Sequence, residues 1–228
     1  MDSPRRSLLA YTVPFALFLG FLALEAAISA MGKGSPNLFL AQPKYWIYPL
    51  QTLVCAAALV WFWKSYPLSP ARGWLAGTVI GILALVLWIA PQAFLGFPAR
   101  VDGFNPTVFP EGSAVYWLTV ISRFARLVIV VPLVEEIFWR GFLMRYLIDE
   151  KFTTVAFGTY RPLSFFAVAV LFMLEHGTVD YVPALITGVL FNAVAVWTKS
   201  LWACVLAHAV TNLGLGLYVM ATRQWGFW

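Results

Sequence analysis

Three short polar clusters interrupt long apolar stretches in the second half of this sequence. The first is the run VEEIFWRGFL at 134–143, which contains two adjacent glutamates and an arginine. The other two, FMLEH at 172–176 and HAVTN at 208–212, each contain one of the two histidines of the chain. Carboxylates and imidazoles transfer protons, and amide or imidazole N–H groups stabilise oxyanions. Together these residue types suit acid–base chemistry on a carbonyl group.

Helical spacing separates the two glutamates of the first cluster. Glu136 and Arg140 are four residues apart with the acid on the N-terminal side, which is the order that favours an ion pair on one helical face. Glu135 projects about 100° away from that pair. We therefore expect Glu136 to neutralise Arg140 and Glu135 to be free to act as a base.

The same spacing recurs in the other two clusters. Phe172 and His176 are four residues apart, and so are His208 and Asn212. Each pair is expected to project from one face of its helix. Three helices could therefore direct a carboxylate, two imidazoles and an amide into one shared cavity. The alternative for a single histidine is a polar group that links two helices by a hydrogen bond.

The composition of the chain excludes an ordinary soluble protein. Of its 228 residues, 61% are apolar and 11% are charged, and the mean hydropathy is +0.81. Soluble proteins have about 25% charged residues. The sequence therefore predicts an all-α fold, a polytopic transmembrane bundle of about seven to eight helices. The net charge of +5 fits basic loops facing anionic lipid, and no basic cluster is dense enough to indicate nucleic-acid binding.

Seven apolar stretches are candidates for membrane-spanning helices, since about 20 apolar residues are needed to cross a bilayer. The fourth is expected to continue to about Ile148, and the fifth and sixth are short. The candidates are Leu8–Met31, Tyr45–Trp63, Gly73–Phe97, Val115–Phe138, Pro162–His176, Val182–Trp197 and Leu201–Met220.

The N-terminus is predicted to lie in the cytoplasm. Arg5 and Arg6 precede an apolar run as in a signal peptide, but the run is longer than the usual signal sequence and further spans follow, which favours a first transmembrane helix. Basic residues concentrate in cytoplasmic loops. One set of alternate loops contains nine of them, and the other contains four: Arg5, Arg6, Lys64, Arg72, Arg140, Arg145, Lys151, Arg161 and Lys199, against Lys33, Lys44, Arg100 and Arg223.

The three clusters together resemble the motifs of the CPBP family of intramembrane proteases, which includes the CAAX prenyl endopeptidases and the bacterial Abi-type proteins. EEIFWR fits E-E-x-x-x-R, FMLEH fits F-x-x-x-H and HAVTN fits H-x-x-x-N. Each motif alone is weak, whereas all three in this order within apolar segments are specific. The resemblance covers about 115–220, nearly half of the chain. The short length and the N-terminal spans are also similar to the CAAX-protease-related proteins that accompany bacterial exosortase systems.

The resemblance implies a metal-independent glutamate endopeptidase without a cofactor. Glu135 would activate the attacking water with the help of His176, and His208 and Asn212 would bind the oxyanion. Low-dielectric surroundings strengthen a carboxylate as a base, which agrees with this assignment.

The resemblance also implies supporting residues and a setting. Glu136, Arg140 and Phe172 would hold the site in shape. Within a single membrane domain, residues 1–114 would form N-terminal transmembrane helices and residues 115–228 the catalytic core. The partners would be the lipid bilayer and a membrane-associated or lipidated peptide or protein substrate, in the bacterial cytoplasmic (inner) membrane.

Three alternatives remain open from the residues. The two glutamates and two histidines could supply a zinc site, although no H-E-x-x-H motif is present. A non-catalytic membrane scaffold or a bacteriocin-immunity protein of the Abi type could use the same cluster for packing or for a partner. A transporter would need a polar path, and the first three spans offer only Glu25.

The depth of the glutamates in the membrane is a further question. Counting along the spans places Glu135 near the cytoplasmic end of its helix and His176 near the far end of its own. We expect the fourth helix to extend past Arg140, so that Glu135 lies deeper and the two can meet. Glu175, beside His176, is interpreted as a residue of the membrane edge, the alternative being that it orients the imidazole.

Overall fold

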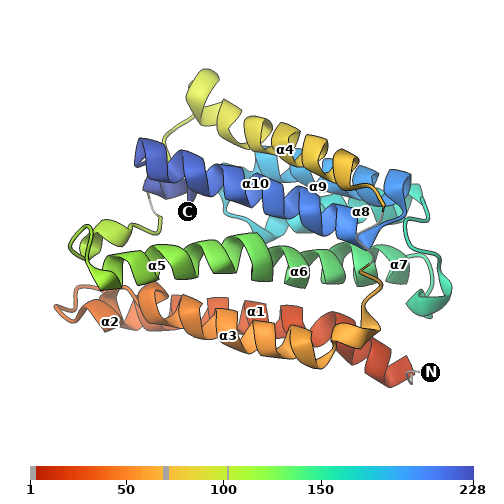
Figure 1. The fold of residues 1–228 in the computed structure, drawn as a ribbon, viewed down its shortest axis with the longest axis horizontal. Helices are drawn as coiled ribbons and strands as arrows, with labels where there is room; N and C mark the ends of the chain where they lie inside the picture. The colour runs from red at the N-terminus through yellow and green to blue at the C-terminus, as the bar shows by residue number, and fades with distance from the viewer. Residues whose placement is uncertain (1–3, 69–71, 102) are drawn as a thin grey trace.

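Helices account for nearly all of the regular structure in the computed structural model, which describes residues 4–68, 72–101 and 103–228 (Figure 1). No strand occurs within these ranges, and the predicted all-α class is confirmed. The helices are α1 Pro4–Met31, α2 Leu38–Ala41, α3 Lys44–Trp61, α4 Trp74–Phe94, α5 Ala114–Ala125, α6 Val131–Glu136, α7 Met144–Tyr146, α8 Pro162–Glu175, α9 Tyr181–Thr198 and α10 Leu201–Thr222.

All seven predicted apolar stretches are helical. Within the described residues, five helical segments are long and apolar enough to cross a membrane: α1, α4, the continuous helix over Ala114–Tyr146, Thr178–Thr198 with α9, and α10. The predicted sixth span is thus longer than expected. The predicted fifth span is short, since α8 has 14 residues, and α3 has 18. The chain is an integral membrane protein by these features.

The helix Ala114–Tyr146 crosses the centre of the bundle. In Figure 1 it lies between a layer of α1 and α3 and a group made of α4, α8, α9 and α10. The largest hydrophobic cluster joins residues of all three parts, such as Phe15 of α1, Val134 of α6 and Cys204 of α10. The Phe15 ring stacks on Phe138 with centroids 3.9 Å apart. This central helix is therefore covered on two sides.

The outer faces of the bundle are apolar. Only 22% of the apolar stretch of α4 is buried inside the protein, against 50% for α10. The exposed remainder of α4 includes Leu75, Val79 and Ile82. Large exposed apolar surfaces are unfavourable in water but not in lipid. These faces therefore fit contact with lipid chains.

The first helix is packed into the bundle. The Tyr66 hydroxyl donates to the Ala10 carbonyl at 2.7 Å, and the Gln51 amide donates to the Phe18 carbonyl at 2.8 Å. Both acceptors lie on α1. The expectation of a first transmembrane helix agrees with this packing.

The central helix contains two wider turns of π-helix, Arg126–Val130 and Ile137–Leu143, on either side of α6. Pro132 has no N–H to donate to the carbonyl four residues before it, which accounts for the first irregularity. Such π segments are frequent at functional sites. The helix continues to Tyr146, so the predicted extension past Arg140 is confirmed.

Two arginines of that extension correct the count of loop charges. Arg140 and Arg145 were assigned to a cytoplasmic loop, but both are buried within the helical segment. Arg145 donates to the Gly141 carbonyl at 2.7 Å. Without them, the loops on that side still contain more basic residues than those on the other.

Close packing of α4 against α10 depends on glycine. A Cβ atom on Gly77 would lie 2.6 Å from the Ala203 carbonyl oxygen, and one on Gly81 would lie 2.5 Å from that of Ala207. Glycine and alanine four residues apart let helix backbones approach closely, as in many membrane proteins. The sequence of α4 therefore determines how near α10, with its histidine, can lie.

We expect Gly77→Ala to destabilise the bundle by about 1–3 kcal/mol, because the new methyl group forces α4 and α10 apart. Gly20→Ala on α1 is the matched control, since nothing lies within 4 Å of its Cβ position; helix propensity alone makes that change neutral or slightly stabilising. Unfolding in a mild detergent measures both. Equal stability of the two variants would contradict the close approach.

Candidate active site

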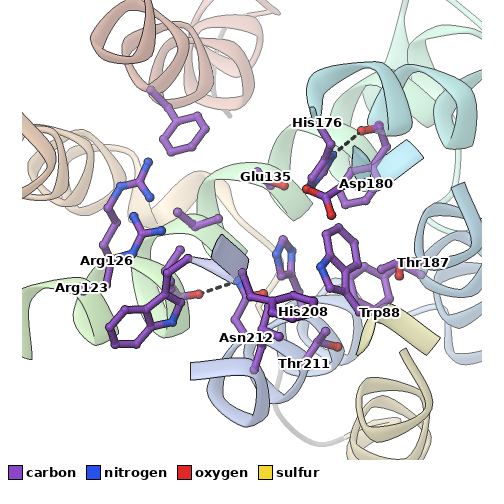
Figure 2. Close-up of a pocket in the computed structure, with 18 of the residues that line it drawn as sticks. Trp88, Arg123, Arg126, Glu135, His176, Asp180, Thr187, His208, Thr211 and Asn212 are labelled. Carbon is purple, nitrogen blue, oxygen red and sulfur yellow. Dashed lines mark hydrogen bonds between the residues drawn. The ribbon is translucent and has the colours of Figure 1, made fainter. Parts of the chain in front are cut away.

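The predicted site residues meet around one cavity. A cavity of about 210 Å³ is lined by Glu135, His176, His208 and Asn212 (Figure 2). Glu135 lies on α6, and His208 and Asn212 lie on α10. His176 is the first residue after α8. The structure therefore brings a carboxylate, two imidazoles and an amide together, as the helical spacing predicted.

Glu136 is the centre of a buried ion network. Its Oε1 atom accepts a hydrogen bond from Arg140 Nη1 at 2.9 Å, which confirms the predicted pair, and it also contacts His208 Nδ1 at 2.9 Å. The Glu136 side chain is completely inaccessible to solvent. The contact with His208 was not predicted, because it joins residues that are 72 positions apart.

Arg140 is held by more than its glutamate. Its Nε donates to Asn192 Oδ1 at 2.9 Å and its Nη2 donates to the Gly188 carbonyl at 3.3 Å, both on α9. The Asn192 amide in turn donates to the Phe165 carbonyl of α8 at 2.7 Å. Asn192 was missed in the sequence, although a lone amide in the apolar run of α9 was a signal. This network fixes α6, α8 and α9 relative to one another.

Glu135 lies about 100° around α6 from Glu136 and lines the cavity. It is 6% exposed, and its Oε2 atom has no hydrogen-bond partner among the described residues. The charged groups near enough to act on it include Glu175, Glu136, Arg140 and Arg126. Glu135 is therefore a buried carboxylate without a direct ion pair, as the spacing predicted.

His176 differs from its prediction. It was placed on the same helix as Phe172, but α8 ends at Glu175 and His176 has extended backbone angles, φ −89° and ψ 164°. The ring still turns back, with Nδ1 2.8 Å from the Phe172 carbonyl oxygen. A carbonyl only accepts, so Nδ1 carries the proton, and in the neutral ring Nε2 is an acceptor.

Phe172 lies between the two imidazoles. Its ring centroid is 4.8 Å from that of His176 and 6.4 Å from that of His208. The Arg140 guanidinium lies over the same ring at 5.0 Å. The side chain is 1% exposed. Phe172 thus packs against both imidazoles and Arg140, in line with a supporting role.

Asn212 is attached to the first π-helical segment. Its Nδ2 atom donates to the Leu127 carbonyl at 2.8 Å. An amide nitrogen has two hydrogens, so one remains for the cavity that Asn212 lines. The wider π turn supplies the carbonyl that orients this side chain.

Glu175, which was interpreted as a residue of the membrane edge, has a carboxylate that is buried inside the protein. Both of its carboxylate oxygens are buried, without a hydrogen-bond partner in the described part of the chain. The Trp139 indole N–H lies close to this carboxylate, but the two do not meet hydrogen-bond geometry. Because α8 leans against the central helix, the carboxylate lies beside Glu135 instead of at the surface. No feature of the sequence near Glu175 signalled this.

The described side chains do not suggest a metal centre. No three of the His, Cys, Asp and Glu residues within them are arranged to hold an ion. Glu136, which the zinc alternative would need as a ligand, contacts Arg140 and His208 instead. Glu136 and His208, two of the four possible zinc ligands, are therefore part of an ion network with Arg140.

Comparison with known proteins gives one match. Residues 116–214 match the family model of the Rce1-like type II CAAX prenyl endopeptidases. No curated protein and no solved structure matches the chain. The matched stretch begins in α5, ends in α10 and contains all three motifs. It confirms the resemblance that those motifs indicated.

Proposed function

We propose that this chain is an intramembrane endopeptidase, because residues 116–214 match the family model of the Rce1-like type II CAAX prenyl endopeptidases. It would hydrolyse a peptide bond of a membrane-associated or lipidated protein. The observation that carries the proposal is the single cavity lined by Glu135, His176, His208 and Asn212. A CAAX-type protease needs these groups within reach of one carbonyl.

Glu135 is proposed to activate the water. Its carboxylate takes a proton from the water, whose oxygen then forms a bond to the carbonyl carbon of the substrate. His176 assists, because its Nε2 lone pair can accept a hydrogen bond from the same water. When the C–N bond breaks, Glu135 returns the proton to the leaving amine, so the enzyme is regenerated.

His208 and Asn212 are proposed to stabilise the oxyanion. The Asn212 amide donates directly from its second hydrogen. His208 donates Nδ1–H to Glu136, so its Nε2 can donate only when the ring is an imidazolium. Glu136 accepts from this ring as well as from Arg140, so its negative charge attracts both cations. We therefore assign to Glu136 the orientation of His208 as well as the pairing of Arg140.

The proposed setting is the cytoplasmic membrane of a bacterium, with the N-terminus in the cytoplasm. The excess of basic residues in one set of loops supports this orientation. The position of Glu135 more than two turns from either end of the 33-residue central helix supports cleavage at membrane depth. The substrate bond would then lie in or near a membrane segment.

The direct test is a comparison of peptide termini in membranes from the native host, with the wild-type chain and with Glu135→Gln at equal expression. Termini present only with the wild type would establish proteolysis and identify the substrate. Identical termini in both strains would favour the scaffold or immunity alternative, and the glutamates would then be a structural network.

Replacement of Asn212 tests the oxyanion assignment. We expect Asn212→Ala to lower kcat by about 10²–10³, as for other oxyanion donors, with little change in KM. Thr187→Val is the matched control, since Thr187 lines the same cavity and its buried hydroxyl has no hydrogen-bond partner in the described residues. Kinetics on the substrate found above measure both. A change confined to KM would argue against the assignment.

A further inference from the structure

Two buried arginines line the same cavity as Glu135. Arg123 and Arg126 lie one turn apart at the junction of α5 and the first π segment, and they are 7% and 6% exposed. Figure 2 shows them on the side of the cavity away from His176. Neither has a carboxylate within ion-pair distance among the described residues. Buried charges are normally paired, so these two stand out.

The hydrogen-bonding capacity of this pair is mostly unused. Nε and Nη1 of Arg123 are buried without a partner in the described residues, and Arg126 Nε donates to Gln51 Oε1 at 2.8 Å. Arg140 and Arg100 differ, because Arg140 contacts Glu136 and Arg100 contacts Asp180. Among these four arginines, the guanidinium N–H groups without a carboxylate partner in the described part of the chain are therefore those of Arg123 and Arg126, at the end of the cavity that these two residues line.

Aromatic rings hold the guanidinium groups in place without neutralising them. Arg123 lies over Phe104 at 4.9 Å, and Arg126 lies over Tyr48 at 4.3 Å and Phe18 at 5.3 Å. A ring face attracts a cation, but it leaves the N–H edges of the guanidinium free. Two like charges at this depth repel each other, and an anion between or beside them removes that cost.

We propose that Arg123 and Arg126 bind a carboxylate of the peptide substrate. This inference rests on the proposed function. A guanidinium presents paired N–H groups that match the two oxygens of a carboxylate. The carboxylate is either the free C-terminus of the peptide or an acidic side chain. A phospholipid phosphate fits less well, because both arginines face an internal cavity and not the lipid-exposed surface.

The spacing along the helix indicates where this carboxylate lies. Glu135 follows Arg126 by nine positions on the same continuous helix and Arg123 by twelve. At about 1.5 Å per residue these separations are roughly 13–18 Å. An extended peptide covers that distance in about four or five residues. Because the arginine side chains reach into the same cavity as Glu135, the anionic group is at most about four or five residues from the scissile bond.

Binding of short peptides tests the proposal without cleavage. The full chain with Glu135→Gln, purified in nanodiscs, is titrated with the apolar hexapeptide acetyl-Ala-Leu-Val-Ala-Leu-Val as free acid and as amide. We expect the acid to bind at least about tenfold more tightly. The preference for the acid over the amide should disappear when Arg126→Gln or Arg123→Gln is added to the Glu135→Gln protein. It should persist in part when Arg126→Lys is added instead. Arg145→Gln, a buried arginine outside the cavity, is the control and should keep it.

Further arms identify the source of the charge. A third peptide ends in aspartate and has an amidated C-terminus. It should bind tightly if a side-chain carboxylate is sufficient and weakly if the free C-terminal carboxylate is required, and either result supports a carboxylate site. Equal affinity for acid and amide, including no detectable binding of either, overturns the proposal. Displacement of the acid by lysophosphatidylglycerol at lower concentration than by the peptide itself overturns the peptide assignment in favour of lipid phosphate.

Failure of this inference differs from failure of the proposed function. A chain that prefers the acid but releases no new termini in the host comparison keeps the anion site and loses the protease assignment. A chain that cleaves a membrane protein but binds acid and amide alike keeps the protease assignment and loses the site.

Discussion

Glu135→Gln is expected to reduce peptide hydrolysis by about 10²–10⁴, the range for loss of a general base. The substitution keeps the size of the side chain and removes only its ability to take a proton. Because Glu135 Oε2 has no hydrogen-bond partner among the described residues, the folded protein loses little when the charge is removed. Rates on the identified substrate, measured with purified protein, check the loss.

The control for this experiment is Glu111→Gln. Glu111 is exposed and pairs with Arg223, and neither residue lines the cavity, so its replacement should leave the rate unchanged. A Glu135→Gln protein that unfolds at the wild-type temperature and retains full activity would remove Glu135 from the role of base. His176 would then be the remaining candidate.

Arg140→Ala is expected to destabilise the protein by about 3–5 kcal/mol and to abolish activity. Removing one partner of a buried ion pair leaves the other charge uncompensated. Here the remaining groups are the Glu136 carboxylate and the side-chain oxygen Oδ1 of Asn192, and both residues are completely buried. Chemical unfolding in detergent measures the stability, and Arg223→Ala, which removes an exposed ion pair, should change it little.

A double variant separates stability from catalysis. In Glu136→Leu/Arg140→Leu both charges are replaced by apolar side chains, which is often neutral or stabilising. We expect much of the lost stability to return and the activity to stay absent, because His208 no longer has its acceptor on Nδ1. Wild-type activity in a stable double variant would show that Glu136 does not orient His208.

Some contacts of the network around Glu136 and Arg140 follow from local helix spacing, and others arise only from tertiary packing. The pair of Glu136 with Arg140 is an i,i+4 contact, so it follows from helix geometry alone. The contacts of Glu136 with His208 and of Arg140 with Asn192 join separate helices. Which of many buried polar groups will face one another depends on the rotation and depth of each helix, and helical periodicity does not fix those.

The sequence by itself determined the membrane class, the positions of the helices and the residues of the candidate site. Hydropathy and length determine helical spans, because a lipid-exposed backbone must satisfy its own hydrogen bonds. The extension of the central helix beyond Arg140 also followed from the sequence, since it lets Glu135 and His176 meet.

Only the tertiary structure decided how deep the polar groups lie and what they contact. Glu175 was interpreted as peripheral, yet the end of α8 leans on the central helix and buries its carboxylate. The sequence shows Arg123 and Arg126 only as two charges within an apolar stretch. The structure places them at the cavity, with no carboxylate of the described residues in ion-pair distance. The physical reason is that burial and pairing arise between helices distant in sequence, from close contacts such as Gly77 on Ala203.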